Sequence, residues 1–199
     1  PDNWRHPSTR PGAIIDMLSR TGLRIVGAKL YQMSVAEALE FYGPVQDALR
    51  RKLAPIIGAK AREVLAKEFG IALKSDAETQ LTELVGCGYA DDQFAQIVEF
   101  MSGRRPDECP QAELNEKGRV KCLAMIYEGS NAIAKIRDVL GPTDPTKAPG
   151  GTVRRDFGSN VMVNTAHASD SPESVTRELK VIRIEDNDIS EIIYNYLKQ

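Results

Sequence analysis

Residues 164–174 read NTAHASDSPES and contain His167, one of only two histidines in the chain. Small alanines flank this histidine, so its ring is accessible to an approaching group. The Ser-Pro dipeptide that follows predicts a helix from Pro172, because proline suits the first helical position. The apolar residues before the histidine predict a strand over 160–168. His167 is therefore expected where a strand ends and a helix is about to begin.

Two interpretations of His167 remain open from the residues alone. A single histidine is more often a structural residue than a nucleophile. A nucleophilic imidazole needs one ring nitrogen held by an acceptor while the other attacks. Glu173 and Glu178 lie on the predicted helix and are candidates for that acceptor.

The composition indicates an ordinary globular chain. It has 199 residues, of which 42% are hydrophobic and 27% charged, so one domain is expected. A net charge of −2 disfavours nucleic acid as a partner, and no apolar run reaches the roughly 18 residues of a membrane span. Three cysteines without a CxxC pair favour reduced thiols and a cytoplasmic location, and argue against a zinc site.

Hydrophobic periodicity predicts a mixed α+β order. The residues favour a helix over 12–22, a strand over 23–33 and a helix over 34–43 that begins after the cap residue Ser34. The next segment, about 44–91, is helical in pattern, with separate helices expected to end at Gly58, Gly70 and Gly86.

The second half returns to alternating elements. Residues 104–119 are charged, contain two prolines and predict an exposed loop. Residues 121–129 predict a strand buried on both faces, and 130–141 predict a helix. The Pro- and Gly-rich segment 141–160 carries basic and hydroxyl side chains that suit a phosphate chain, although a solvated loop explains the same composition. The last residues, from 185, predict an amphipathic helix.

With these pieces placed, the chain resembles the nucleoside diphosphate kinases. NTAHASDSPESVTRE is similar to the family signature N-x-x-H-G-S-D-S followed by a helix with a Glu, except that Ala168 replaces the Gly. PDNWRHPSTRPGAII, LRIVGAKLYQMS, EFYG, LAMIYEGSNAI, IRDVLGPTDP and GGTVRRDFG match other family segments in order. The resemblance covers roughly 1–43 and 92–182.

The resemblance implies a function and a set of site residues. Family members move the γ-phosphate of ATP to a histidine and then to a nucleoside diphosphate, with Mg²⁺ held through the nucleotide phosphates rather than by protein ligands. His167 would be the phosphorylated residue, with Glu178 on its other nitrogen and Ser169 nearby. The nucleotide would be bound by Tyr42, Phe94, Arg137, Thr143, Arg154 and Asn164.

The resemblance also implies a fold and an assembly. The fold is a ferredoxin-like α/β sandwich, an antiparallel four-stranded sheet with helices on one face, in a chain that forms a homodimer or a larger homo-oligomer. The whole chain, 1–199, would be one such domain, with a helical insertion at about 44–91 and a loop insertion at about 104–119. The family's first strand and its phosphate-binding lysine precede the segment that matches Pro1-Asp2, so we expect either further chain before Pro1 or another segment that supplies the strand.

One departure leaves a second function open. Gln93 stands where the family has a base-stacking Phe, with Phe94 next to it. The departure and the insertion are also compatible with a catalytically impaired nucleotide-binding or sensing module, whose insertion binds a partner.

Overall fold

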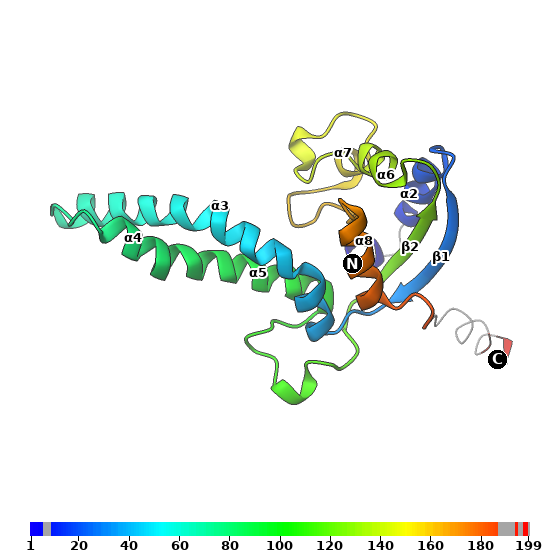
Figure 1. The fold of residues 1–199 in the computed structure, drawn as a ribbon, viewed down its shortest axis with the longest axis horizontal. Helices are drawn as coiled ribbons and strands as arrows, with labels where there is room; N and C mark the ends of the chain where they lie inside the picture. Colours follow the sequence, from blue (N-terminus) through cyan, green and yellow to red (C-terminus); the bar gives the residue numbers. More distant parts are fainter. Residues whose placement is uncertain (6–8, 187–193, 195–196, 199) are drawn as a thin grey trace. The chain divides into compact units, whose positions relative to one another are not determined.

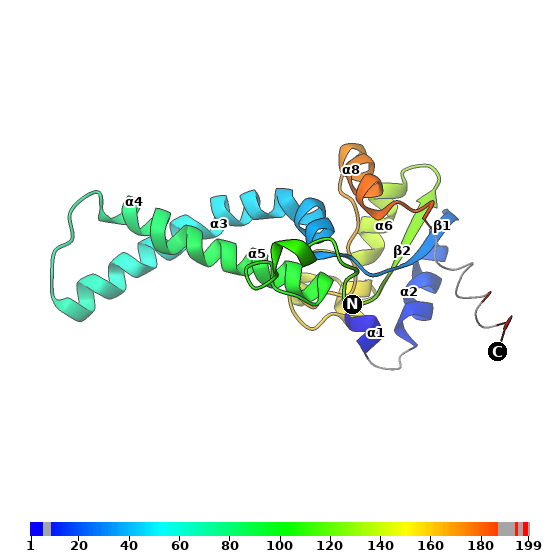
Figure 2. The ribbon, with the colours of Figure 1, turned by 90° about the horizontal axis from the view of Figure 1, so that it is seen from below.

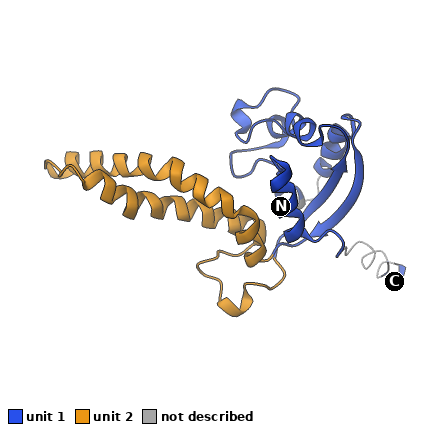
Figure 3. Ribbon diagram, in the orientation of Figure 1, with its two compact units in different colours: residues 1–33, 119–199 blue, residues 34–118 orange. Residues whose placement is uncertain are grey.

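The computed structural model describes residues 1–5, 9–186, 194 and 197–198. The chain divides into two compact units, which Figure 3 shows in different colours. The first, called the sheet unit, comprises 1–33 and 119–199, and the second, called the helical unit, comprises 34–118.

The sheet unit is built on an antiparallel pair of strands, β1 (Arg24–Tyr31) and β2 (Cys122–Glu128) (Figure 1). Both strands were expected, because branched and aromatic residues fit a pleated surface. A bulge between Ile25 and Gly27 shifts the register once. The strand expected over 121–129 is confirmed, but its burial on both faces is not, since β2 is only half-buried along most of its length.

The strand expected over 160–168 is absent from the part of the chain that the structure describes, where the sheet has two strands. This segment instead makes a tight turn around Asn160, whose Oδ1 accepts hydrogen bonds from the amides of Met162 and Val163 at 2.9 and 2.8 Å. Backbone groups that close such a local turn do not extend a ladder. The apolar pattern alone could not distinguish the two outcomes.

Helices contact both faces of this sheet, rather than the one face that was expected. On one face, Met125 and Tyr127 pack against a core from α2 (Arg10–Ser19), α6 (Ala132–Leu140) and α7 (Val153–Phe157), centred on Ile14, Leu18, Leu140 and Val153. On the opposite face, Lys29, which pairs with Ala124, hydrogen-bonds to the end of α8 (Pro172–Ile182). Figure 2 shows the sheet from a second side, with α2 and α8 on either side of it.

The segment 141–160 is ordered around two short helices, η3 (Pro145–Lys147) and α7. Gly141 has a φ of +77°, and a Cβ there would lie 2.8 Å from Thr152 Oγ1. Glycine therefore suits this position, where the start of the loop comes close to Thr152. The guanidinium of Arg155 donates to the carbonyl of Pro145 at 3.3 Å. These contacts close the loop on itself.

The helical unit begins with one long helix, α3 (Val35–Phe69). Ser34 and Glu37 form a reciprocal capping box at its start, as the sequence predicted for Ser34. The expected helix ends at Gly43 and Gly58 are wrong, because α3 continues through both and ends at Gly70, where φ is +62°.

The chain returns through α4 (Ala77–Leu81), a π-helical turn η1 (Thr82–Gly86) and α5 (Cys87–Ser102). The expected end at Gly86 is also wrong, since α5 follows directly and ends at Gly103. A Cβ on Gly58 would lie 2.7 Å from Thr82 Cα, and one on Gly86 would lie 2.8 Å from the carbonyl carbon of Ala54. These glycines therefore allow the backbones of α3 and η1 to touch.

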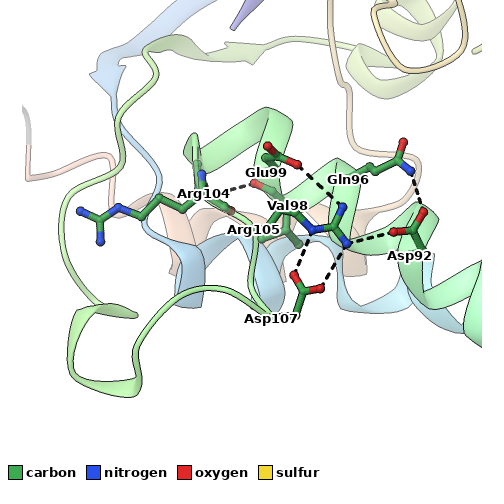
Figure 4. Close-up of polar contacts among 8 residues, drawn as sticks. Asp92, Gln96, Val98, Glu99, Arg104, Arg105 and Asp107 are labelled. Atoms are coloured by element: carbon green, nitrogen blue, oxygen red, sulfur yellow. Dashed lines mark hydrogen bonds and ion pairs between the residues drawn. The ribbon is translucent and has the colours of Figure 1, made fainter.

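Two arginines attach the loop after α5 to the helix end. The guanidinium of Arg105 bonds to Asp92 and Asp107 at 2.9 and 3.1 Å and lies 3.9 Å from Glu99 (Figure 4). Arg104 pairs with two glutamates of the loop, one of them in the short 3₁₀ helix η2 (Gln111–Glu113). The loop expected over 104–119 is thus irregular but fixed by charge.

The two ends of the chain complete the description. A short helix, α1 (Asp2–Arg5), opens it. Most of the amphipathic helix expected at the C-terminus lies outside the described residues. Within those residues, no helix combines the length and the apolar character that crossing a bilayer requires.

Candidate functional site

The candidate site is arranged around α8, whose start was predicted from the sequence. Ser171 accepts a hydrogen bond from the backbone amide of Ser174 at 3.1 Å, and Pro172 occupies the first helical position. Apolar residues and Glu178 lie on the face of the amphipathic helix that packs inward. The helix ends at Ile182, with Arg183 in the left-handed region.

Glu178 contacts the ring of His167, as a nucleophilic histidine with an acceptor on one ring nitrogen requires. His167 Nε2 lies 3.1 Å from both Glu178 Oε1 and Oε2. The Ser169 hydroxyl donates to Oε2 at 2.6 Å, and Arg177 Nη2 donates to Oε1 at 3.3 Å. The Glu178 side chain is 7% exposed and that of His167 is 41% exposed. The carboxylate is therefore a buried support, and the imidazole is its solvent-facing partner.

The environment of Glu178 favours its ionised form. Burial on its own raises the pKa of this carboxyl, because a low dielectric penalises charge. The hydrogen bonds from His167 and Ser169, and the charges of His167 and Arg177, outweigh burial and hold the pKa of Glu178 below its usual range. An ionised carboxylate only accepts, so His167 must donate from Nε2. When the imidazole is neutral, the other ring nitrogen, Nδ1, then carries the lone pair.

The backbone before His167 is constrained. Thr165 has a φ of +82°, a conformation that β-branched residues rarely adopt. Asn3 donates its side-chain amide to the Thr165 carbonyl at 3.0 Å, and the buried Thr165 hydroxyl oxygen has no hydrogen-bond partner among the residues that the structure describes. Such strain persists only where surrounding contacts determine the conformation.

Arg154 connects the loop to the histidine segment. Its two terminal nitrogens donate to the carbonyls of Gly141 and Ala166, each at 2.7 Å, while its buried Nε meets no hydrogen-bond acceptor within the described part of the chain. Burial, and then the nearby charge of Arg137, lower the pKa of this guanidinium. Arg154 and Arg137 repel each other, and a bound anion would reduce that repulsion.

Asp170 adds a negative group on the same side. A hydrogen bond from Ser174 at 2.6 Å lowers the pKa of Asp170, and the charges of Arg137 and His167 lower it further. Asp170 is therefore influenced by the positive charges of both Arg137 and His167.

The remaining candidates are placed less directly. Thr143 is exposed on the loop, and Asn164 donates its side-chain amide to the carbonyl of Val161 at 2.7 Å. Tyr42 and Phe94 belong to the helical unit and are buried there, 9% and 4% exposed. The cluster around His167 is therefore formed by residues of the sheet unit.

Two residues of this cluster were not found by sequence reasoning. Arg177 touches Glu178, and its place beside that glutamate in the helix was the only available signal. The positive φ of Thr165 carries no sequence signal, because threonine is not typical of that conformation.

The described residues hold no group of three or more His, Cys, Asp or Glu that could bind a metal ion by themselves. Both oxygens of Glu178 already accept hydrogen bonds.

Sequence comparison with known proteins points to one family. The sequence profile of the nucleoside diphosphate kinase family matches residues 113–187. The nucleoside diphosphate kinase of Persephonella marina is 35% identical over 147 residues, which cover 74% of this chain and 92% of that protein. That of Halalkalibacterium halodurans is 44% identical over 139 residues, covering 70% and 76%.

Solved structures agree on the fold. An NDP kinase from Pyrobaculum aerophilum superposes with a TM-score of 0.52 at 24% identity, covering 85% of each chain. The Aquifex aeolicus nucleoside diphosphate kinase gives a TM-score of 0.50 at 24% identity, covering 86% of this chain and 82% of that one. The α+β, ferredoxin-like class with a helical insertion is confirmed. The chain belongs to the nucleoside diphosphate kinase family, a family of phosphotransferases.

Proposed function

We propose that this chain is a nucleoside diphosphate kinase that works through a phosphohistidine on His167. The observation that carries the proposal is the contact between His167 Nε2 and both oxygens of the buried Glu178, 3.1 Å each. Holding Nε2 as the donor orients Nδ1 for attack, which is how a third group activates a nucleophile. The 41% exposure of the His167 side chain allows a phosphate to reach the ring.

The reaction has two balanced half-steps. Nδ1 attacks the γ-phosphorus of ATP, a P–N bond forms, the bond to the bridging oxygen breaks, and ADP leaves with that electron pair. A terminal oxygen of a nucleoside diphosphate then attacks the same phosphorus, and the P–N bond breaks. Glu178 stabilises the positive charge that the ring gains in the first half-step.

The charge on the phosphates is met by residues near His167. Arg137, Arg154, Thr143 and Asn164 are proposed to bind the phosphates and sugar. Two features of Arg154 support this role: its buried Nε has no partner in the described residues, and the charge of Arg137 lowers its pKa. Mg²⁺ bound to the nucleotide phosphates would neutralise charge on the transferred group, which suits a site whose carboxylate is already engaged.

We also propose the organisation that the family implies. The whole chain would be one nucleoside diphosphate kinase-like domain with insertions at about 44–91 and 104–119, acting in the cytoplasm as a homodimer or larger homo-oligomer. The positive and hydroxyl side chains of 141–160 would then lie on the nucleotide side of that domain.

The test is the intact mass of the protein after incubation with Mg-ATP and again after addition of a nucleoside diphosphate. We expect one acid-labile phosphoryl group, discharged by the diphosphate, in the wild type and in His6→Ala. His167→Ala should gain none. Transfer that persists in His167→Ala would refute the mechanism, and nucleotide binding without phosphorylation in the wild type would favour the nucleotide-sensing alternative.

A further inference from the structure

The C-terminal end of α8 is held by two side chains from β1, some 150 positions earlier in the chain. Lys29 Nζ donates to the carbonyls of Ile182 and Arg183, each at 3.0 Å. The Tyr31 hydroxyl donates to the carbonyl of Val181 at 3.2 Å. The last carbonyls of a helix lack partners within the helix and are usually met by water or by a local turn. Here side chains of the sheet take that place.

The position of Lys29 is unusual for a cation. Its side chain belongs to a residue only 6% exposed, and a buried ammonium is costly unless it is hydrogen-bonded and its charge is balanced. The two carbonyls carry the negative end of the α8 dipole, and the ring of Tyr31 lies 5.1 Å from Nζ. Lys29 and Tyr31 are two positions apart on β1, so their side chains lie on the same face of the sheet.

The held carbonyls lie one turn beyond Glu178. Val181 and Ile182 follow this glutamate by three and four residues, which places them next to it along the same side of α8. Ser171 caps the other end of the helix within its own first turn, so the contacts of Lys29 and Tyr31 are the ones that join α8 to β1. Sliding or rotation of this end of α8 on the sheet would break those bonds.

We propose that Lys29 and Tyr31 are positioning residues for the phosphotransfer reaction, acting by fixing the turn of α8 that carries Glu178 against His167. The proposal rests on the proposed function of the His167–Glu178 pair. A shift of about 1 Å in a supporting group is enough to cost on the order of a hundredfold in rate. The hydrogen bonds to Val181, Ile182 and Arg183 prevent such a shift.

The experiment measures the tautomer of His167 and the kinetics of the full-length protein. The chain has two histidines, so ¹⁵N ring signals can be assigned by comparison with His167→Ala. In the wild type we expect His167 protonated at Nε2. Lys29→Met should produce a mixture of tautomers and lower kcat by about tenfold while KM for the nucleotide stays the same. Tyr31→Phe, which removes only the oxygen, should do the same to a smaller extent.

Lys180→Met is the matched control, because it makes the same change at an exposed position near the same end of α8. It should leave the tautomer and kcat unchanged. If Lys29→Met fails to fold, Tyr31→Phe decides. A folded Lys29→Met or Tyr31→Phe with wild-type tautomer and kcat would overturn the proposal. If the wild type accepts no phosphoryl group, the proposed function fails, while the tautomer signals still decide whether Lys29 and Tyr31 position the pair.

Discussion

The sheet unit and the helical unit use polar groups in opposite ways. In the sheet unit, Glu178 is buried, and each of its oxygens accepts from side chains around it. The helical unit has two arms, α3 and the returning segment from α4 to α5. The ion pair that joins Arg50 of one arm to Asp91 of the other is open to solvent, since their side chains are 45% and 38% exposed. There the close contact is between backbones, at Gly58 and Gly86. Buried polar groups thus set the geometry of the candidate site, and small residues set the geometry of the helical arms.

This difference separates what a substitution should damage in each unit. A buried, hydrogen-bonded carboxylate affects chemistry through orientation and charge. A glycine at a backbone contact affects stability through volume. Four substitutions or conditions test the contrast, in order of decreasing effect.

Glu178→Gln should have the largest effect. The amide cannot accept on both sides as the carboxylate does, nor balance the charge of a phosphorylated ring. We expect phosphorylation of His167 to slow by about a hundredfold or more, as for other nucleophile–base systems. Glu173→Gln, an exposed change on the same helix, should keep the wild-type rate. Rapid-quench phosphorylation with Mg-ATP measures both, and equal rates in the two variants would contradict the role of Glu178.

Gly86→Ala should destabilise the helical unit through a small change in volume. The added Cβ would lie 2.8 Å from the Ala54 carbonyl carbon, so α3 and η1 must move apart. We expect the free energy of unfolding to fall by about 1–3 kcal/mol. Denaturant titration monitored by circular dichroism measures this loss.

Gly88→Ala supplies the control, since a Cβ there meets nothing within 4 Å. It should stabilise the protein by about 0.5–1 kcal/mol, because alanine favours a helix interior over glycine. If Gly86→Ala were also stabilising, the result would contradict the close contact between the backbones of α3 and η1 at Gly86.

Acid should weaken the sheet unit through Glu178. Its pKa is lowered on folding, so the stabilisation is fully present above the unfolded value of about 4.3 and is lost as the pH falls through the lower folded value. The free energy of unfolding of wild type should therefore fall more steeply than that of Glu178→Gln below about pH 4. Parallel denaturant titrations from pH 7 to pH 3 give the comparison. Identical pH dependence would mean that the carboxylate is not held by His167 and Ser169.

Arg50→Met should have the smallest effect. This arginine makes a two-pronged contact with Asp91, at 2.6 and 2.7 Å, that raises the pKa of Arg50 and lowers that of Asp91. Both partners are exposed, so solvent and salt screen the pair. We expect a change in stability well below that of Gly86→Ala, and smaller still in high salt. A loss as large as that of Gly86→Ala would show that surface charge, not backbone contact, holds the arms together.

Local signals predicted the parts of the fold that local forces decide. The caps at Ser34 and Ser171 and the strands at 23–33 and 121–129 are found where the residues favour them. Glycine was misleading inside the helical unit. The sequence cannot distinguish a glycine that ends a helix, such as Gly70, from one that lets a second helix approach, such as Gly58.

The sequence by itself determined the residue types of the candidate site: a histidine flanked by alanines, and a glutamate on the helix that Pro172 begins. Their spacing brings His167 and Glu178 into reach because a short capped helix follows the histidine. Only the tertiary structure decided that Lys29 and Tyr31 hold the end of that helix, and that 160–168 closes a turn instead of joining the sheet. The physical reason for the first is that caps and helix starts depend on neighbours in the chain, whereas the contacts of Lys29 and Tyr31 join segments far apart in the sequence. The turn after Asn160 is local, but the apolar residues of 160–168 suit a strand equally well, so their pattern does not decide between the two.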